Sequence, residues 1–242
     1  MTQRILLPFV VTIGTLLLLG LGTWQMQRLA WKDALIAERE AGLTLPPTAL
    51  PADLDEVDKA KAFAFRKVMV TGVFRHDLEQ LFGAMARGNV LGHHILTPLV
   101  TEQGVPVLVD RGWVPADKVD PAFRLDGQLE GEVTISGIAR FRWDDRPGAF
   151  TPDNDPAAGR WYHYDLDQMA ATLGLDLAPI VVEADDTANP GGLPIGGRTR
   201  ITLTNNHLQY AVTWYGLAAT LIGVYIVFRR QNRASPSSNA GG

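Results

Sequence analysis

Two stretches of the chain decide its fold: residues 5–23, ILLPFVVTIGTLLLLGLGT, and residues 210–228, YAVTWYGLAATLIGVYIVF. Each stretch is 19 residues long and holds no charged side chain. At about 1.5 Å per residue, a helix of this length comes close to crossing the roughly 30 Å hydrocarbon core of a membrane. The sequence therefore predicts a transmembrane helix near each end of the chain.

Each stretch has an alternative interpretation. The first could be a cleaved signal peptide, with residues 20–22 (GLG) as a small-residue cleavage site. We favour an uncleaved helix, because residues 24–31 continue the helical pattern past that site. The second could be a buried core helix of a soluble protein, but its abrupt end at Arg229 and Arg230 favours a membrane span.

The charges are unevenly distributed around the two stretches. The short flanks hold basic residues and no acidic ones: Arg4, Arg28, Arg229, Arg230 and Arg233. Basic flanks mark the cytoplasmic side, so we expect a two-pass protein with both termini cytoplasmic and the segment between the helices outside the cytoplasm. That segment carries a net charge of −9 within a chain total of −4, which speaks against nucleic acid as a partner. No long Arg/Ser-rich leader precedes the first stretch, so we expect a bacterial inner membrane.

These features divide the chain into four predicted parts. Residues 1–28 form a cytoplasmic stub and the first transmembrane helix, and residues 29–206 form a periplasmic, strand-rich domain. Residues 207–228 form the second transmembrane helix. Residues 229–242 form a cytoplasmic tail, whose Ser/Asn/Gly-rich composition indicates disorder.

The segment between the helices has the period-two alternation of half-buried strands. The pattern is clear over residues 66–76, 105–113 and 133–143. Weaker strand candidates are residues 79–87, 93–101, 160–164, 179–184 and 199–204. Helices are expected over residues 29–40, over the charged and exposed residues 53–62, and over residues 165–174. The predicted fold class is two transmembrane α-helices flanking a mainly antiparallel β domain, barrel- or sandwich-like, with an α+β composition.

The composition excludes several kinds of chemistry. The chain has no cysteine, so it can form no disulfide, thiolate zinc site, iron–sulfur cluster or covalently attached c-type haem. Three of the four serines lie in the tail, and Ser136 lies in a predicted strand without a nucleophile-elbow sequence. The Gly-rich segment 189–198 has no Lys-Ser/Thr after it and is not a phosphate loop. We expect no enzyme activity.

His207 is the strongest candidate for cofactor chemistry. It lies three residues before the second uncharged stretch, at the level of the outer headgroups, and helical spacing places Tyr210 and Trp214 on its face with Ala211 and Ala218. One interpretation is an interfacial aromatic belt with a polar cap. The other is a site for a flat, non-covalently bound haem, with the imidazole as axial ligand of the iron.

Three motifs carry a family resemblance. They are residues 19–32 (LGLGTWQMQRLAWK), residues 111–115 (RGWVP) and residues 206–214 (NHLQYAVTW). Their order and spacing, together with the two-helix plan, resemble the surfeit-locus protein 1 family over the whole chain except the tail. Alternation within the second motif also predicts that Arg111 and Trp113 share one face of a strand.

The resemblance implies a respiratory-chain assembly factor, a membrane chaperone for haem–copper cytochrome c oxidase. Such a factor binds haem a transiently and assists its delivery to catalytic subunit I. The family's bacterial haem-binding histidine corresponds to His207. We add Trp24, Tyr210, Trp214 and Arg111 as cofactor-binding candidates, with Arg111 placed to meet a haem propionate.

The partners expected from the resemblance are oxidase subunit I, haem A synthase and membrane lipid. An alternative hypothesis is a membrane-anchored scaffold that stabilises an oxidase assembly intermediate and binds no cofactor. The sequence leaves open which oxidase is the client, whether a second axial ligand exists, whether haem binding is essential, and the oligomeric state.

Overall fold

The computed structural model describes residues 2–51, 54, 57–141, 144–145, 148, 151–197 and 205–234 of the chain. The chain forms two compact units. One unit consists of residues 1–38 and 202–242, and we call it the helix pair. The other consists of residues 39–201, and we call it the barrel domain.

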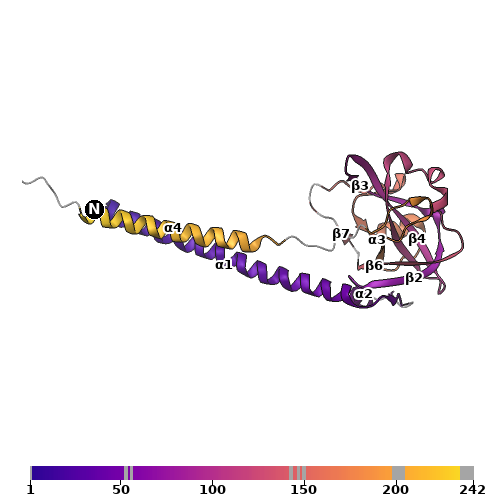
Figure 1. The fold of residues 1–242 in the computed structure, drawn as a ribbon, viewed down its shortest axis with the longest axis horizontal. Helices are drawn as coiled ribbons and strands as arrows, with labels where there is room; N and C mark the ends of the chain where they lie inside the picture. The colour runs from indigo at the N-terminus through magenta and orange to yellow at the C-terminus, as the bar shows by residue number, and fades with distance from the viewer. Residues whose placement is uncertain are drawn as a thin grey trace, which may run out of the picture. The chain divides into compact units, whose positions relative to one another are not determined.

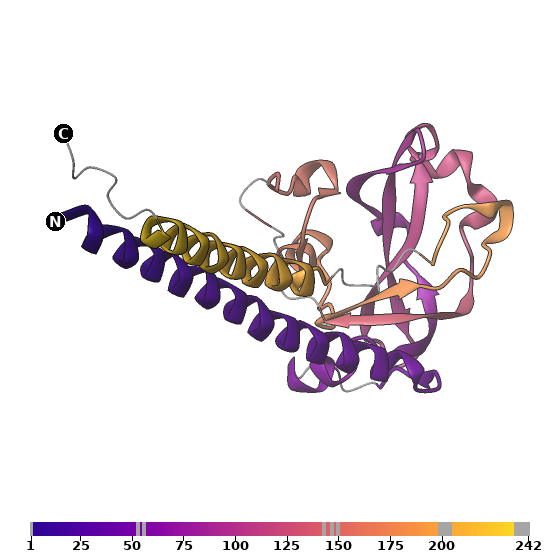
Figure 2. The same ribbon diagram turned by 60° about the vertical axis from the view of Figure 1, so that its left-hand side comes forward.

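The helix pair is built from the two apolar stretches. Helix α1 (Thr2–Thr44) and helix α4 (His207–Ala234) run side by side in both views of the molecule (Figures 1 and 2). Residues Leu6–Thr44 and His207–Asn232 are long and apolar enough to cross a membrane. Only 6% and 11% of their most apolar windows are buried, which is unlike the core helix of a soluble protein.

The ends of the helices differ in part from the prediction. The expected helix over residues 29–40 is confirmed as a continuation of α1. The expectation of a disordered tail from residue 229 is wrong for residues 229–234, because α4 continues to Ala234. The rest of the tail, residues 235–242, lies outside the described residues.

The barrel domain is made mainly of strands, with short helices between them. The strands are β1 (Thr48–Ala49), β2 (Lys67–Phe74), β3 (Gln80–Arg87), β4 (Val90–Thr101), β5 (Pro106–Pro115), β6 (Glu132–Phe141), β7 (Asp144–Asp145), β8 (Arg160–Trp161), β9 (Tyr164–Asp165) and β10 (Ile180–Ala184). The α-helices are α2 (Val57–Ala62) and α3 (Leu166–Leu173). The 3₁₀ helices are η1 (His76–Leu78), η2 (Ala116–Lys118), η3 (Pro121–Phe123), η4 (Leu125–Gly127), η5 (Pro156–Ala158) and η6 (Pro190–Gly192).

The strand pairing closes into a ring. The order β2-β6-β10-β5-β4 returns to β2 through a β2–β4 pairing, so these strands form a closed barrel without free edges. The pairs β2–β6, β6–β10, β4–β5 and β2–β4 are antiparallel, whereas β5 and β10 are parallel. The predicted α+β class with a barrel-like, mainly antiparallel domain is confirmed.

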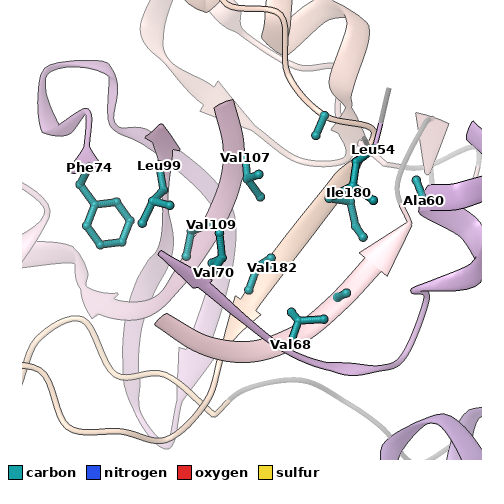
Figure 3. Close-up of a cluster of buried hydrophobic side chains, with 12 residues drawn as sticks. Leu54, Ala60, Val68, Val70, Phe74, Leu99, Val107, Val109, Ile180 and Val182 are labelled. Atoms are coloured by element: carbon teal, nitrogen blue, oxygen red, sulfur yellow. The ribbon is translucent and has the colours of Figure 1, made fainter. Parts of the chain in front are cut away.

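The inside of the barrel is an apolar core. Alternate residues of the ring strands point inward, as expected for a period of two, and Figure 3 shows side chains from β2, β4, β5 and β10 turned toward one another. The core residues on these strands are Val68, Val70, Phe74, Leu99, Val107, Val109, Ile180 and Val182. Leu54 and Ala60 also belong to this core, so the prediction of an exposed helix over residues 53–62 is wrong for these two positions.

A second apolar cluster lies on another face of the sheet. It joins Leu96, Leu108 and Val181 of the ring to Trp161, Tyr164, Leu166 and Met169. Helix α3 supplies two of these residues, and its ends are those expected from the sequence. The Asp165 side chain accepts a hydrogen bond from the Gln168 N–H, and Gly174 ends the helix in the left-handed conformation at φ 64°.

The predicted strands agree with the structure wherever it describes them, with one exception. The segment 160–164 is not one strand, because Tyr162 and His163 separate β8 from β9. The candidate strand over residues 199–204 and the last two residues of the 133–143 strand lie outside the described residues.

Candidate functional site

The two helices of the helix pair approach closely at small residues. Gly22 of α1 lies against Tyr215 of α4, and a Cβ added to Gly22 would be 2.6 Å from Tyr215 Cε1. Ala211 and Ala218 of α4 are each only 1% exposed. Small residues let helix backbones approach without a hydrophobic driving force, which is how helices pair inside a membrane.

Polar side chains of the two helices form hydrogen bonds with one another beyond this contact, toward the C-terminal end of α1. The hydroxyl groups of Thr23 and Tyr215 lie 3.2 Å apart. Two residues further along α1, Gln25 Oε1 lies 2.7 Å from His207 Nδ1. Beyond it, Asn205 Nδ2 donates to Asp33 Oδ1 at 2.7 Å. Thr23, Gln25 and Asp33 pair in turn with Tyr215 and His207 of α4 and with Asn205 just before it, so numbers rise along α1 as they fall toward the start of α4, and the helices are antiparallel.

The Gln25 contact determines how the His207 ring is presented. An amide oxygen only accepts hydrogen bonds, so Nδ1 of His207 carries the proton and donates it to Gln25. The lone pair is then on Nε2, which has no partner among the described residues. A histidine with one ring nitrogen held by a neighbour and the other left as a base is the usual arrangement of a metal-ligating histidine. The donor set thus fits an axial ligand of haem iron.

Gln25 is buried, although it is polar. It is 8% exposed in the helix pair, and its oxygen is satisfied by His207. We did not single it out from the sequence. A signal was present in the spacing, because Gln25 lies three residues after Gly22, which places both residues on one face of a helix.

The three aromatic residues that we predicted to bind the cofactor lie on the same two helices. Trp24 is 51% exposed and Tyr210 is 55% exposed, while Trp214 is half-buried. Within the described helices, no hydrogen bond or ring contact joins any of the three to His207. Exposed Trp and Tyr side chains are typical of the membrane–water interface. Their part in cofactor binding stays a prediction.

Arg111 belongs to the barrel domain and lies at a β-bulge. On β4, Ile95 and Leu96 are neighbours, but their partners on β5 are Gly112 and Asp110, so Arg111 is an extra residue. Gly112 has a φ of 115°, which only glycine adopts easily.

The bulge overturns one prediction. Asp110 and Trp113 pair with Leu96 and His94, which are two residues apart on β4 and so share a face. Arg111 instead lies beside Val109 and Phe74. The prediction that Arg111 and Trp113 share a face is therefore wrong, because the extra residue shifts the alternation.

The structure also reveals a buried pair that we did not predict. His94 Nδ1 lies 2.8 Å from Asp110 Oδ2, and both side chains are 8% exposed. Asp110 Oδ1 also accepts a hydrogen bond from the Gly112 N–H at 2.9 Å, so this pair holds the backbone of the bulge. No group of three or more His, Asp or Glu side chains within the described ranges could hold a metal ion.

The model of the SURF1 family matches residues 12–219, which include the helix pair contacts and the whole barrel. This match covers much more than half of the chain.

Individual relatives agree with the family match. Surfeit locus protein 1 of Homo sapiens is 40% identical over 233 residues, covering 90% of this chain and 75% of the human protein. The protein of the same name from Rattus norvegicus is 41% identical, covering 90% of this chain and 73% of its own length. A SURF1-like protein of Monosiga brevicollis is 37% identical, covering 88% and 83%. The chain with the Gln25–His207 contact and the closed barrel belongs to the SURF1 family.

Proposed function

We propose that this protein is an assembly factor for haem–copper cytochrome c oxidase, and that it binds haem a and assists its delivery to catalytic subunit I. The family membership supports the assembly role. The observation that carries the haem role is the His207–Gln25 contact, which leaves Nε2 as a lone-pair donor.

The haem is the cargo in this proposal. When bound, it supplies an iron whose axial position takes a neutral imidazole nitrogen. His207 binds the iron, and Gln25 holds the ring in the required tautomer. Trp24, Tyr210 and Trp214 would offer apolar surfaces to the ring system. A single protein ligand without covalent attachment suits a carrier, because the haem must leave again.

The proposed location is a bacterial inner membrane, with both termini cytoplasmic and the barrel domain in the periplasm. The basic flanks of the two apolar helices support this orientation. Oxidase subunit I, haem A synthase and membrane lipid are the proposed partners.

The test is haem content after expression beside a haem A pathway. The full-length protein is purified in a non-ionic detergent and its reduced pyridine haemochrome spectrum is recorded. We expect the wild type to carry haem a, the His207→Ala variant to lose it, and the Gln209→Ala variant to retain it. Gln209 is the matched control because it is an exposed polar residue in the same turn of α4.

The same experiment separates the carrier from the scaffold without a cofactor. A wild-type protein that is free of haem under these conditions contradicts the carrier role. If subunit I still co-purifies with that haem-free protein and with His207→Ala, the scaffold hypothesis replaces it.

A further inference from the structure

The apolar interior of the barrel ends in a cavity of about 320 Å³. Phe74 of β2, Arg111 of β5, and Val133 and Ile135 of β6 line it, together with residues 184–185 and 187–190, at the end of β10 and after it. The mouth of a β-barrel is a frequent site for small ligands, and this volume lies at the lower end of the usual range.

Arg111 is the next inward-facing residue of β5, at a position where an apolar core residue would be expected. Val107 and Val109 point into the core, and Arg111 is the next residue of that row, only 2% exposed. Its guanidinium lies over the Phe74 ring, with 4.7 Å between Cζ and the ring centroid. A charged side chain at the end of an apolar row is costly unless something pairs with it.

The described part of the chain leaves this guanidinium largely without partners. Nη2 donates a hydrogen bond to the Gly127 carbonyl oxygen, while Nε and Nη1 donate none. No carboxylate oxygen of the described residues lies within the 4.0 Å of an ion pair. Arg111 therefore has unused donors in a fixed planar arrangement.

The nearby acidic groups are engaged elsewhere. Glu79 forms a two-point ion pair with Arg124. Asp185 lines the cavity, but its Oδ1 accepts a hydrogen bond from the Thr187 N–H at 3.0 Å. Burial lowers the pKa of Arg111 to about 10, the charge of Glu79 opposes this shift, and the charge of Arg124 adds to it. The side chain stays cationic at neutral pH.

We propose that the barrel-mouth cavity binds a carboxylate group carried on an apolar body, with Arg111 as the residue that binds the carboxylate. Nη2 has a second N–H besides the one given to Gly127, and together with Nε or Nη1 it forms an edge that can donate to both oxygens of a carboxylate. Leu129, Val133 and Ile135 contact the apolar body. A singly charged carboxylate fits better than a phosphate dianion, because Arg111 is the one guanidinium among the described lining residues and Asp185 shares the lining.

This site is independent of the proposed haem ligand, since it uses no residue of the helix pair. The carboxylate could come from a free carboxylic acid or from the propionate arm of a haem. The chemistry is the same in both cases, and the experiment below distinguishes the two sources.

The first arm uses hexanoate as the probe and hexanamide as its uncharged analogue. The full-length protein is titrated in a non-ionic detergent, and both its Tm and the side-chain Nε–H resonance of Arg111 are measured. We expect hexanoate to raise the Tm and shift the Arg111 resonance, and hexanamide to do neither. Equal effects of the two probes, or an unshifted Arg111 resonance, would overturn the proposal.

Variants locate the effect at the cavity. Arg111→Met removes the charge at similar volume, and we expect an equal or higher Tm without hexanoate but no response to it. Ala184→Phe keeps Arg111 and fills the cavity, so it too should lose the response, which keeps the test decisive if Arg111→Met does not fold. His207→Ala should respond to hexanoate as the wild type does. An unchanged response in both cavity variants contradicts the site.

The second arm compares haem with its dimethyl ester. If esterification weakens haem binding to the wild type but not to Arg111→Met, the carboxylate is a haem propionate. If haem and ester bind equally while hexanoate still binds, the ligand is a free carboxylic acid.

Discussion

Gln25 and His207 show how much a single contact adds to a histidine. Without an acceptor at Nδ1, a neutral imidazole exchanges between two tautomers, and only one presents Nε2 as a base. With Gln25 Oε1 at 2.7 Å, the ring has one orientation and one tautomer. The sequence indicated the histidine, but the residue that orients it is 182 positions away along the chain.

Removing that acceptor should weaken haem binding. Gln25→Leu keeps the volume but loses the oxygen, and we expect haem affinity to fall about 10- to 100-fold, as is usual when a residue that orients a metal ligand is lost. Gln25→Glu should restore most of the affinity because it keeps an acceptor. The measurement is a haem titration of each purified protein.

A control and a direct observation accompany this titration. Gln27→Leu changes an exposed glutamine of the same helix and should bind haem as the wild type does. The ¹⁵N shifts of His207 in haem-free protein should report a proton on Nδ1. A proton on Nε2 instead would contradict the proposed orientation even if haem binds.

Gly22 governs the contact between α1 and α4. We expect Gly22→Leu to push the helices apart by a few ångströms, because a Cβ added there would lie only 2.6 Å from Tyr215 Cε1. Gly20→Leu is the matched control, since nothing lies within 4 Å of a Cβ at that position. The chain has no cysteine, so spin labels on cysteines introduced at Val10 and Val224 report the distance without background. Equal distances in both variants would rule out this role for Gly22.

Arg124 joins the loop of η2–η4 to the start of β3. Its guanidinium forms a two-point ion pair with Glu79 and also donates to the carbonyl oxygens of Lys118 and Val119. The paired side chains are only 1% and 7% exposed. Arg124→Leu leaves the buried Glu79 carboxylate without its ion-pair partner. We therefore expect the free energy of unfolding to fall by about 3–5 kcal/mol.

Urea unfolding followed by tryptophan fluorescence measures this loss. The comparison is Arg75→Leu, which breaks the ion pair with Asp77, whose two side chains are 44% and 61% exposed. That change should leave stability unaltered within error, because exposed pairs contribute little. If both variants lose the same stability, burial is not the reason for the contribution of Arg124.

At the scale of the whole molecule, we expect the polypeptide chain to span the membrane twice. Single cysteines at Asn89, in the β3–β4 turn, and at Ser237, in the tail, test this in a chain that has no cysteine of its own. A maleimide that cannot cross membranes should label the Asn89 position in intact spheroplasts. It should label the Ser237 position only after lysis. Labelling of the tail in intact cells would reverse the proposed orientation.

Local sequence patterns were enough to predict the two apolar helices, most of the barrel strands and helix α3. These elements depend on local polarity and on the spacing of apolar residues, and both can be read from residues that are close together in the sequence. The break between β8 and β9 was missed, since short strands carry little local signal.

The chemistry of the candidate sites depends instead on contacts between segments that are distant in the sequence. Pairing with β4 created the bulge that puts Trp113 on the other face of β5, while Arg111 stays in the inward row of Val107 and Val109 and lines the barrel mouth. Close packing of α1 against α4 brought Gln25 to His207. Both outcomes depend on contacts between distant segments, whose register is set by the packing of whole strands and helices rather than by the residues nearby.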